Sequence, residues 1–300
     1  MKNPWKRLHG WIDDYRLLAL RREVEAELTR SLGRELLLRP AGGGRGHNRV
    51  FLAVDRATAA EILATVRIPL PWRQHVPAES LSCRTVLPGE ERVLREARVC
   101  TELAAVNVAP RPLRSSHTFY AGEHLPWSRL KDVVRRDAHA VWGILPAVLR
   151  VLRSMHRRGI AHLDLNCGNV LVSPDRRQVR LIDFEYAPAP GVGAGQLQAF
   201  DLLRLLHSLL RPRRASVALL ADVPRLLGMI ATDAPHLIGI CRSQLPPDGF
   251  EQLQRSGRLG AEIVNLLCSR RPAPAIPEIP DHGEFGISSV RMASGTKVSV

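Results

Sequence analysis

Lysine is almost absent from this sequence of 300 residues, so arginine carries nearly all of its positive charge. The lysines are Lys2, Lys6, Lys131 and Lys297, whereas lysine and arginine together number 43 and give a formal net charge of +14. A genome biased toward arginine codons would account for the choice of arginine, but not for the excess of bases over acids. That excess indicates an anionic partner, which could be a phosphorylated substrate, an acidic membrane surface or nucleic acid.

Paired cysteines and long apolar runs are absent as well. The five cysteines are widely scattered and form no CxxC pair, which indicates neither a zinc site nor a disulfide scaffold and suits a reducing cytoplasm. No stretch reaches the roughly 18 apolar residues of a membrane span. The first residues, MKNPWKRLHGW, lack the apolar region of a signal peptide. The sequence therefore predicts a cytoplasmic protein.

The richest pattern lies at residues 159–186, GIAHLDLNCGNVLVSPDRRQVRLIDFEY. Asp164 is followed five residues later by Asn169, and two short apolar strands then flank a Pro-Asp turn and end at Asp183. Such strands form a hairpin, so Asn169 and Asp183 can lie side by side at its open end. Hard oxygen ligands of this kind suit Mg²⁺ bound to substrate phosphates. A buried hairpin with acids placed by chance is the alternative.

The order HLDLNCGN, strand, turn, strand, DFE resembles the protein-kinase catalytic loop H-x-D-x-x-x-x-N followed by D-F-G. Over about residues 35–210 the chain is similar to the protein-kinase-like superfamily. Within it, the chain looks most like bacterial lipopolysaccharide-core (heptose/Kdo) kinases, whose loop reads D-L-N-x-x-N. This resemblance implies an α+β, two-lobed protein-kinase-like fold with a β-rich N-lobe and a mainly helical C-lobe.

The resemblance and the local patterns together predict four segments. They are an N-terminal amphipathic helix at 1–33, an N-lobe at 34–123, a C-lobe at 124–271 and a disordered tail at 272–300. The first helix combines tryptophan with basic residues, so it could lie on an anionic membrane. Packing on the upper lobe is favoured, because most amphipathic stripes face a core.

A glycine-rich turn between two predicted strands, AGGGRGHN, is the candidate for covering nucleotide phosphates with backbone N–H groups. The glycines that would permit this close approach are Gly42, Gly43, Gly44 and Gly46. A flexible turn with no ligand is the alternative. The hinge between lobes is expected at 118–123, where Tyr120, Ala121 and Glu123 are candidates for contacts with adenine by position.

The resemblance calls for a lysine on the third strand, and none is present. The segment reads ATVRI, so Arg67 keeps the positive charge but presents a planar fork rather than a point charge. This departure leaves catalysis open to question. The acid that would orient Arg67 is Glu96, in the helical pattern ERVLREARVCTEL. Glu91 and Glu102 are rivals, and a solvated helix face is the alternative for all three.

A predicted helix at about 196–210 contains Asp201 among leucines. This acid either complements the helix dipole or, as the resemblance implies and we prefer, binds the backbone of the catalytic loop. Only seventeen residues separate Asp183 from Asp201, and A-P-E is absent. The short segment argues against a regulated protein kinase and for a small-molecule or glycolipid kinase. We expect His162 to pack structurally.

These residues support the hypothesis of phosphoryl transfer from ATP to a hydroxyl. Asp164 would accept or orient the hydroxyl proton, and Asn169 and Asp183 would hold Mg²⁺. Arg67 would contact phosphates, and Glu96 would orient it. By resemblance, the acceptor is an anionic sugar or glycolipid, a heptose or Kdo of the lipopolysaccharide core, met on the inner face of the inner membrane.

Other functions stay open at this point. Because of Arg67, the chain could be a catalytically impaired kinase-like module that binds a nucleotide or a partner. An atypical protein Ser/Thr kinase is a further alternative. A nucleic-acid-binding protein ranks last, because the basic residues are not interleaved with aromatic ones and no motif of that class is present.

Overall fold

Successive side chains of the third strand point to opposite faces of the sheet, and this determines which of them face the interior of the N-lobe, called the upper lobe below. The computed structural model describes residues 12–41, 47–58, 60–70, 83–211, 214–238 and 258–269. In the third strand, Val66 and Ile68 are fully buried in an apolar cluster, and Arg67 between them points to the opposite face. One face of the sheet is thus a hydrophobic core, and the other carries charge.

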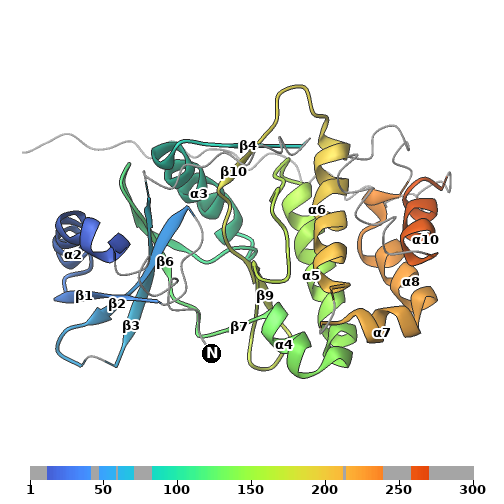
Figure 1. Ribbon diagram of the computed structural model, residues 1–300, viewed down its shortest axis with the longest axis horizontal. Helices are drawn as coiled ribbons and strands as arrows, with labels where there is room; N and C mark the ends of the chain where they lie inside the picture. Colours follow the sequence, from blue (N-terminus) through green and yellow to red (C-terminus); the bar gives the residue numbers. More distant parts are fainter. Residues whose placement is uncertain are drawn as a thin grey trace, which may run out of the picture.

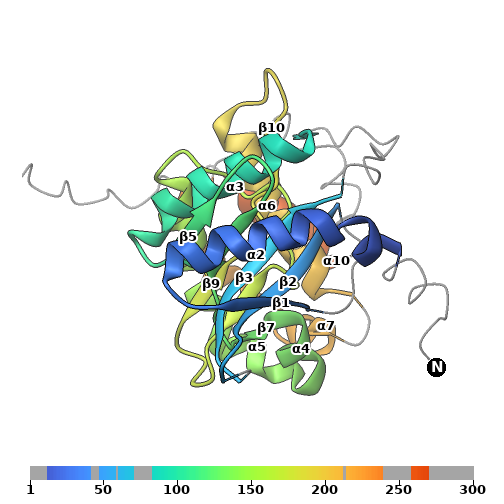
Figure 2. The same cartoon turned by 90° about the vertical axis from the view of Figure 1, so that its left-hand side faces the viewer.

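The upper sheet has five antiparallel strands in the order β1-β2-β3-β6-β5. Their bounds are β1 Leu36–Pro40, β2 Asn48–Asp55, β3 Ile62–Pro69, β5 Pro112–Ser115 and β6 Tyr120–Glu123. Helix α2 (Leu18–Leu32) crosses one face of this sheet, as Figure 2 shows, and α3 (Gly89–Ala104) lies on the other side. The charged face of β3 therefore looks toward α3.

The C-lobe, called the lower lobe below, lies on the right of Figure 1 and is mainly helical. Its described α-helices are α4 Leu130–Arg136, α5 Val141–His156, α6 Ala194–Leu209, α7 Ser216–Ala221, α8 Val223–Asp233 and α10 Arg258–Leu267, with 3₁₀ turns η2 Ala138–Ala140 and η3 Pro235–Leu237. A small sheet, ordered β7-β8-β9, adds the strands β7 Ser128–Arg129, β8 Val170–Val172 and β9 Val179–Leu181. The predicted α+β architecture with a β-rich N-lobe and a helical C-lobe is confirmed.

A two-stranded sheet also connects the two halves. Strand β4 (Arg84–Val86) pairs antiparallel with β10 (Tyr186–Pro188), which follows the DFE motif, and the pair lies at the top of Figure 1. The sequence analysis placed no strand at Arg84–Val86, so β4 was missed. Three residues are too few to show an alternating pattern, and the strand exists because of a partner about a hundred residues away in the chain.

The predicted hinge is wrong in its position. Residues Tyr120–Glu123 form β6, a strand paired on both sides with β3 and β5. Phe119 and Ala121 are fully buried, which is why this segment enters the sheet instead of linking the lobes. The chain leaves the upper sheet after Glu123 and reaches the lower lobe through residues 124–127.

Helix α2, the described part of the helix expected at 1–33, packs on the upper sheet, and the tryptophan-bearing start of that segment lies outside the described residues. Leu17, Val24 and Leu28 are at most 2% exposed and join the apolar cluster of the sheet. No helix among the described residues is long and apolar enough to span a membrane. The described part excludes residues 1–11, the tail predicted at 272–300, and the predicted phosphate-binding glycines Gly42, Gly43, Gly44 and Gly46.

The packing of α2 can be tested with two leucines of the same helix. Leu28 is fully buried, whereas Leu18 is 42% exposed. Leu28→Ala should lower the free energy of unfolding by about 2–5 kcal/mol, because it removes buried methyl groups and leaves a cavity. Leu18→Ala should change it by no more than about 0.5 kcal/mol. Denaturant unfolding of both variants checks this; equal effects would show that α2 does not pack as described.

Candidate functional site

The β8–β9 hairpin brings the predicted metal ligands together. Val170 pairs with Leu181, and the backbone N–H of Ile182 donates to the Asn169 carbonyl oxygen at 3.0 Å. Asn169 and Asp183 therefore leave the same end of the hairpin, as predicted. Asp183 has a φ of 80°, in the left-handed region that Asp tolerates better than most residues. This backbone turn directs its side chain away from the strand.

A buried carboxylate holds the loop at 162–169, which the sequence predicts to be the catalytic loop. Asp201 of α6 is fully buried, and its two oxygens accept the backbone N–H groups of His162 at 2.8 Å and Leu163 at 2.7 Å. Leu163 has a φ of 67°, an unfavourable conformation for a leucine that these contacts stabilise. The preferred role of Asp201, binding the loop backbone, is confirmed over a helix-dipole role alone.

His162 has the structural role that the sequence predicted. Its Nε2 lies 3.0 Å from the carbonyl oxygen of Ile182, and its ring packs against Phe184 at 4.5 Å between centroids. The imidazole thus ties the catalytic loop to the DFE segment. It is fully buried, so it lies away from any bound substrate.

Asp164 lies at the centre of a ring of donors. The side-chain amides of Asn166 and Asn169 donate to its backbone oxygen at 2.9 and 3.0 Å and approach its Oδ2 at 3.2 and 3.3 Å. Its Oδ1 accepts a hydrogen bond of 2.6 Å from each of two arginines, Arg84 and Arg204. The structure therefore places Asp164 and Asn169 within hydrogen-bonding distance of one another.

The sequence analysis missed both arginines. Arg204 follows Asp201 by three residues on α6, so the helix periodicity places the two on one face, which was an available signal. Arg84 gave no signal, because it reaches the site only through the pairing of β4 with β10.

Arg67 joins three elements through one guanidinium. Its Nη1 contacts the carboxylate of Glu96 on α3 and lies 2.8 Å from Asp183 Oδ1. Glu96 is 3% exposed, while its rivals Glu91 and Glu102 are exposed on the helix surface. The expected pairing of Arg67 with Glu96 is present, and the contact with Asp183 was not foreseen.

The charges in this cluster depend on one another. Burial works to lower the pKa of Arg67, but Glu96 and Asp183 more than offset it, so the pKa lies above its ordinary value. Burial raises the pKa of Glu96, and Arg67 opposes that rise. The guanidinium therefore stays charged, and the two carboxylates are its compensation.

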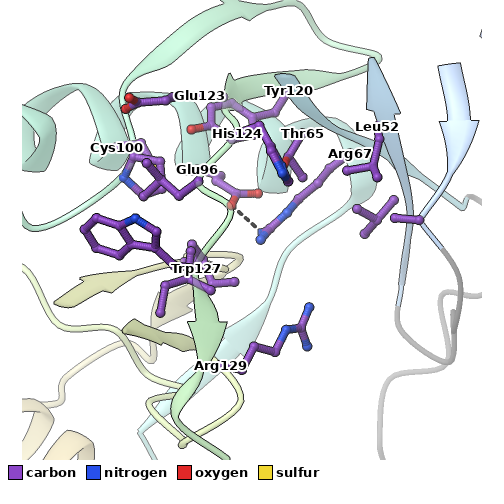
Figure 3. A pocket seen from close by; sticks show the side chains of 17 residues that line it. Leu52, Thr65, Arg67, Glu96, Cys100, Tyr120, Glu123, His124, Trp127 and Arg129 are labelled. Atoms are coloured by element: carbon purple, nitrogen blue, oxygen red, sulfur yellow. Dashed lines mark hydrogen bonds and ion pairs between the residues drawn. The ribbon is translucent and has the colours of Figure 1, made fainter. Parts of the chain in front are cut away.

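A cavity of about 200 Å³ lies between the lobes beside this cluster (Figure 3). One part is charged, with Arg67 and Glu96 pointing toward one another, and the rest is lined mostly by apolar and aromatic side chains. Tyr120 lines the cavity with its side chain, as do His124 and Trp127, which the sequence analysis did not single out. Ala121 is fully buried and does not line it. The apolar and aromatic part of the cavity suits the flat base of a nucleotide, and the cationic Arg67 suits its phosphates.

Two titratable groups of the cavity are neutral at ordinary pH. Burial raises the pKa of the Cys100 thiol to about 12, so this cysteine is no nucleophile. Burial lowers the pKa of His124, whose Nδ1 lies 3.1 Å from the Thr65 hydroxyl. Neutral polar groups in the lining of the cavity suit recognition of an uncharged ring.

The donors present fit magnesium only together with a ligand. The described residues contain no group of three or more His, Cys, Asp or Glu that could hold a metal. Asn169 and Asp183 offer two oxygen donors on one hairpin end. Magnesium commonly takes one or two carboxylates and completes its shell with substrate phosphates and water, so these residues suit a metal that arrives with a nucleotide.

A second polar cluster lies behind the catalytic loop. His156 Nε2 is 3.1 Å from Asp201 Oδ2, and His156 Nδ1 is 2.9 Å from Nε2 of His236. Burial lowers the pKa of His236 to about 4, and the neighbouring charges of His156, Arg153 and Arg157 act in the same direction. Asp201, which holds the loop, is therefore linked through His156 to His236, and the imidazole of His236 is neutral at ordinary pH.

Comparison with known proteins places these residues in context. Residues 126–227, about a third of the chain, match the sequence model of the Lipopolysaccharide kinase (Kdo/WaaP) family. The matched stretch contains the catalytic loop, Asp183 and Asp201. Among solved structures, the chain is similar to the PknI kinase domain of Mycobacterium tuberculosis, with a TM-score of 0.42 and 18% identity over 79% of this chain and 89% of that one. Over residues 126–227 the chain is therefore similar to lipopolysaccharide kinases.

The role of Arg67 as a shared counter-ion predicts a large loss of stability when it is removed. Arg67→Met should lower the free energy of unfolding by about 3–5 kcal/mol, because it leaves two carboxylates without their partner. Arg34→Met, which removes an exposed arginine from its ion pairs with Glu61 and, at 3.8 Å, Asp55, should cost about 1 kcal/mol or less. Equal losses in urea unfolding would show that the Arg67 pair is not held as described.

The cluster behind the loop predicts a pH dependence. Above pH 6.5 His236 is neutral in both folded and unfolded chains; as pH falls toward 4 only the unfolded chain takes up the proton. The free energy of unfolding should therefore decrease as pH falls from 6.5 to 4. In the His236→Gln variant this decrease should be smaller than in the wild type. Thermal unfolding between pH 4 and 7 measures the difference. His117→Gln, at an exposed site, should follow the wild-type curve.

Proposed function

We propose that this protein is an ATP-dependent phosphotransferase that acts on a hydroxyl of a sugar or glycolipid acceptor. The observation that carries the proposal is that Asn169 and Asp183 leave one end of a hairpin, with Asp164 hydrogen-bonded to Asn169, beside a cavity with Arg67 at its charged end. The match to a lipopolysaccharide kinase family over the same residues supports this choice of reaction and of acceptor class.

The proposed chemistry is divided among Asp164, Asn169, Asp183 and Asp201. Asp164 takes the proton of the acceptor hydroxyl while the oxygen of that hydroxyl bonds to the γ-phosphorus of ATP. The bond from this phosphorus to the oxygen that bridges it to the β-phosphate breaks, which releases ADP. Asn169 and Asp183 hold Mg²⁺, which neutralises the charge of the phosphates. Asp201 acts as a positioning residue, because it fixes the loop that carries Asp164.

Arg67 serves as the substitute for the usual lysine in this proposal. It keeps Glu96, and with it α3, close to Asp183, and it presents its remaining donors to the cavity. A guanidinium has five N–H groups, so it can hold two carboxylates and still bind a phosphate oxygen, which a lysine does less readily.

A second function is favoured by one contact. Arg67 lies 2.8 Å from Asp183 Oδ1 and so takes up one oxygen of the proposed metal ligand. If that contact persists with nucleotide bound, the chain is a catalytically impaired module that binds a nucleotide or a partner. A protein Ser/Thr kinase is less favoured, because only residues 189–193 separate β10 from α6, too few for a long activation segment.

The proposed acceptor is anionic, a heptose or Kdo of the lipopolysaccharide core, and the proposed place is the cytoplasmic face of the inner membrane. The net charge of +14 supports both, since it would attract an anionic glycolipid and an acidic membrane surface. Nucleic acid is not proposed as a partner.

The test is ATP consumption with Mg²⁺, using purified protein and deacylated lipopolysaccharide core. Asp164→Asn and Asp183→Asn should each reduce turnover by at least about a hundredfold, because the proton acceptor or a metal ligand is lost. Asp132→Asn, in an exposed pair with Arg135 on α4, should retain wild-type turnover.

Three results separate the candidate functions. Turnover that requires both carboxylates and the core sugar establishes the kinase. Binding of ATP with no turnover on this acceptor favours the impaired module or another acceptor. Absence of both nucleotide binding and turnover contradicts the enzymatic function.

A further inference from the structure

Both oxygens of the Asp164 carboxylate are already in use. Oδ1 accepts hydrogen bonds of 2.6 Å from Arg84 and Arg204, and Oδ2 lies near the amides of Asn166 and Asn169. A carboxylate has about four lone-pair sites, so none is left for another donor. An acceptor hydroxyl that gives its proton to Asp164 must therefore displace one of these four donors.

The positive charges of Arg84 and Arg204 are only partly compensated by the single negative charge of Asp164. Within the described part of the chain, Asp164 is the only carboxylate that either Arg84 or Arg204 contacts. Two positive charges share one negative charge, and the arginine side chains are only 9% and 19% exposed. Partly buried charge without a partner is costly, so an approaching ligand that brings a negative charge is favoured here.

Arg84 is held in place independently of Asp164. Its guanidinium stacks on the Tyr186 ring at 4.0 Å, and its Nη1 also donates to the carbonyl oxygen of Leu163 at 2.9 Å. The pairing of β4 with β10 fixes the backbone of both ring and guanidinium. Arg84 would thus keep its position when a ligand displaces it from the Asp164 carboxylate.

Unused donors remain on both arginines. The Nε atoms of Arg84 and Arg204 are buried and have no hydrogen-bond partner. Folded proteins rarely leave buried donors unpaired, and the exceptions often have a role in binding. Nε and Nη of one guanidinium form the fork that binds a planar oxyanion through two parallel hydrogen bonds.

We propose that Arg84 and Arg204 are specificity residues that bind an anionic group of the acceptor, next to the hydroxyl that Asp164 activates. This inference rests on the proposed phosphotransferase function and adds a residue-level requirement to it. The hydroxyl takes the place of one arginine on Asp164 Oδ1, and that arginine donates instead to the acceptor's carboxylate or phosphate. A neutral sugar offers nothing to that arginine and is discriminated against.

The test compares equilibrium binding of three forms of deacylated lipopolysaccharide core to the full chain, measured by calorimetry. One form is native, one has its carboxylates reduced to alcohols, and one has its phosphates removed. The wild type should bind native core about tenfold to a hundredfold more tightly than the form that lacks the recognised anion. The form that loses affinity identifies the anion as carboxylate or phosphate.

Variants connect that preference to the two arginines. Arg84→Gln should weaken binding of native core at least about tenfold and should largely abolish the difference between the forms. Arg84→Lys should restore part of the preference, because it restores the charge without the fork. Arg114→Gln, in an exposed pair on β5, should leave all affinities unchanged. Arg204→Gln, on α6, provides a second test if Arg84→Gln fails to fold.

The outcomes separate this inference from the proposed function. Equal affinity of the wild type for all three forms, or binding of none, overturns the inference. So does an equal loss on all forms in both glutamine variants, because a purely structural role would act in that way. Charge-selective binding that depends on Arg84, without any phosphorylation, contradicts the proposed function but supports the anion site. Efficient phosphorylation of an uncharged core supports the function and overturns the anion site.

Discussion

The buried carboxylate of Asp201 is the constraint on which the rest of the site depends. It accepts the backbone N–H groups of His162 and Leu163, and so holds the loop in a conformation with a left-handed leucine that would otherwise be unfavourable. Burying an unpaired carboxylate is expensive, and here the loop amides are its compensation. The loop and helix α6 therefore require one another, and the position of Asp164 follows from this mutual stabilisation.

Charge compensation extends the same logic from the lower lobe to the upper one. Arg67 on β3 is satisfied only when Glu96 of α3 and Asp183 of the lower lobe are both near it. A single guanidinium thus couples the sheet, the helix and the hairpin that carries the proposed metal ligand. Removal of any one partner would leave buried charge, so this ion-pair cluster resists independent movement of the three elements.

Local spacing explains what the sequence could predict. The five residues from Asp164 to Asn169 and the hairpin that follows are set by short-range geometry, whereas the pairing of Glu96 with Arg67 was expected only from the resemblance. Arg84 and the strand β4 escaped prediction because they depend on pairing with β10, about a hundred residues away. The hinge was placed too early because buried residues at 119–121 extend the sheet, and their burial depends on α2 and the neighbouring strands.

At the site, the contacts made by individual arginines explain why arginine rather than lysine is present. Arg67 contacts two carboxylates through one nitrogen, and Arg84 contacts a carbonyl oxygen, a carboxylate and an aromatic ring. The Arg84 combination uses the planar face of the guanidinium as well as its donors, and a lysine ammonium would satisfy only part of it. Codon bias could supply arginine anywhere on the surface, but it does not explain partly buried arginines that each join several elements. At these positions the choice of arginine follows from the geometry that the site requires.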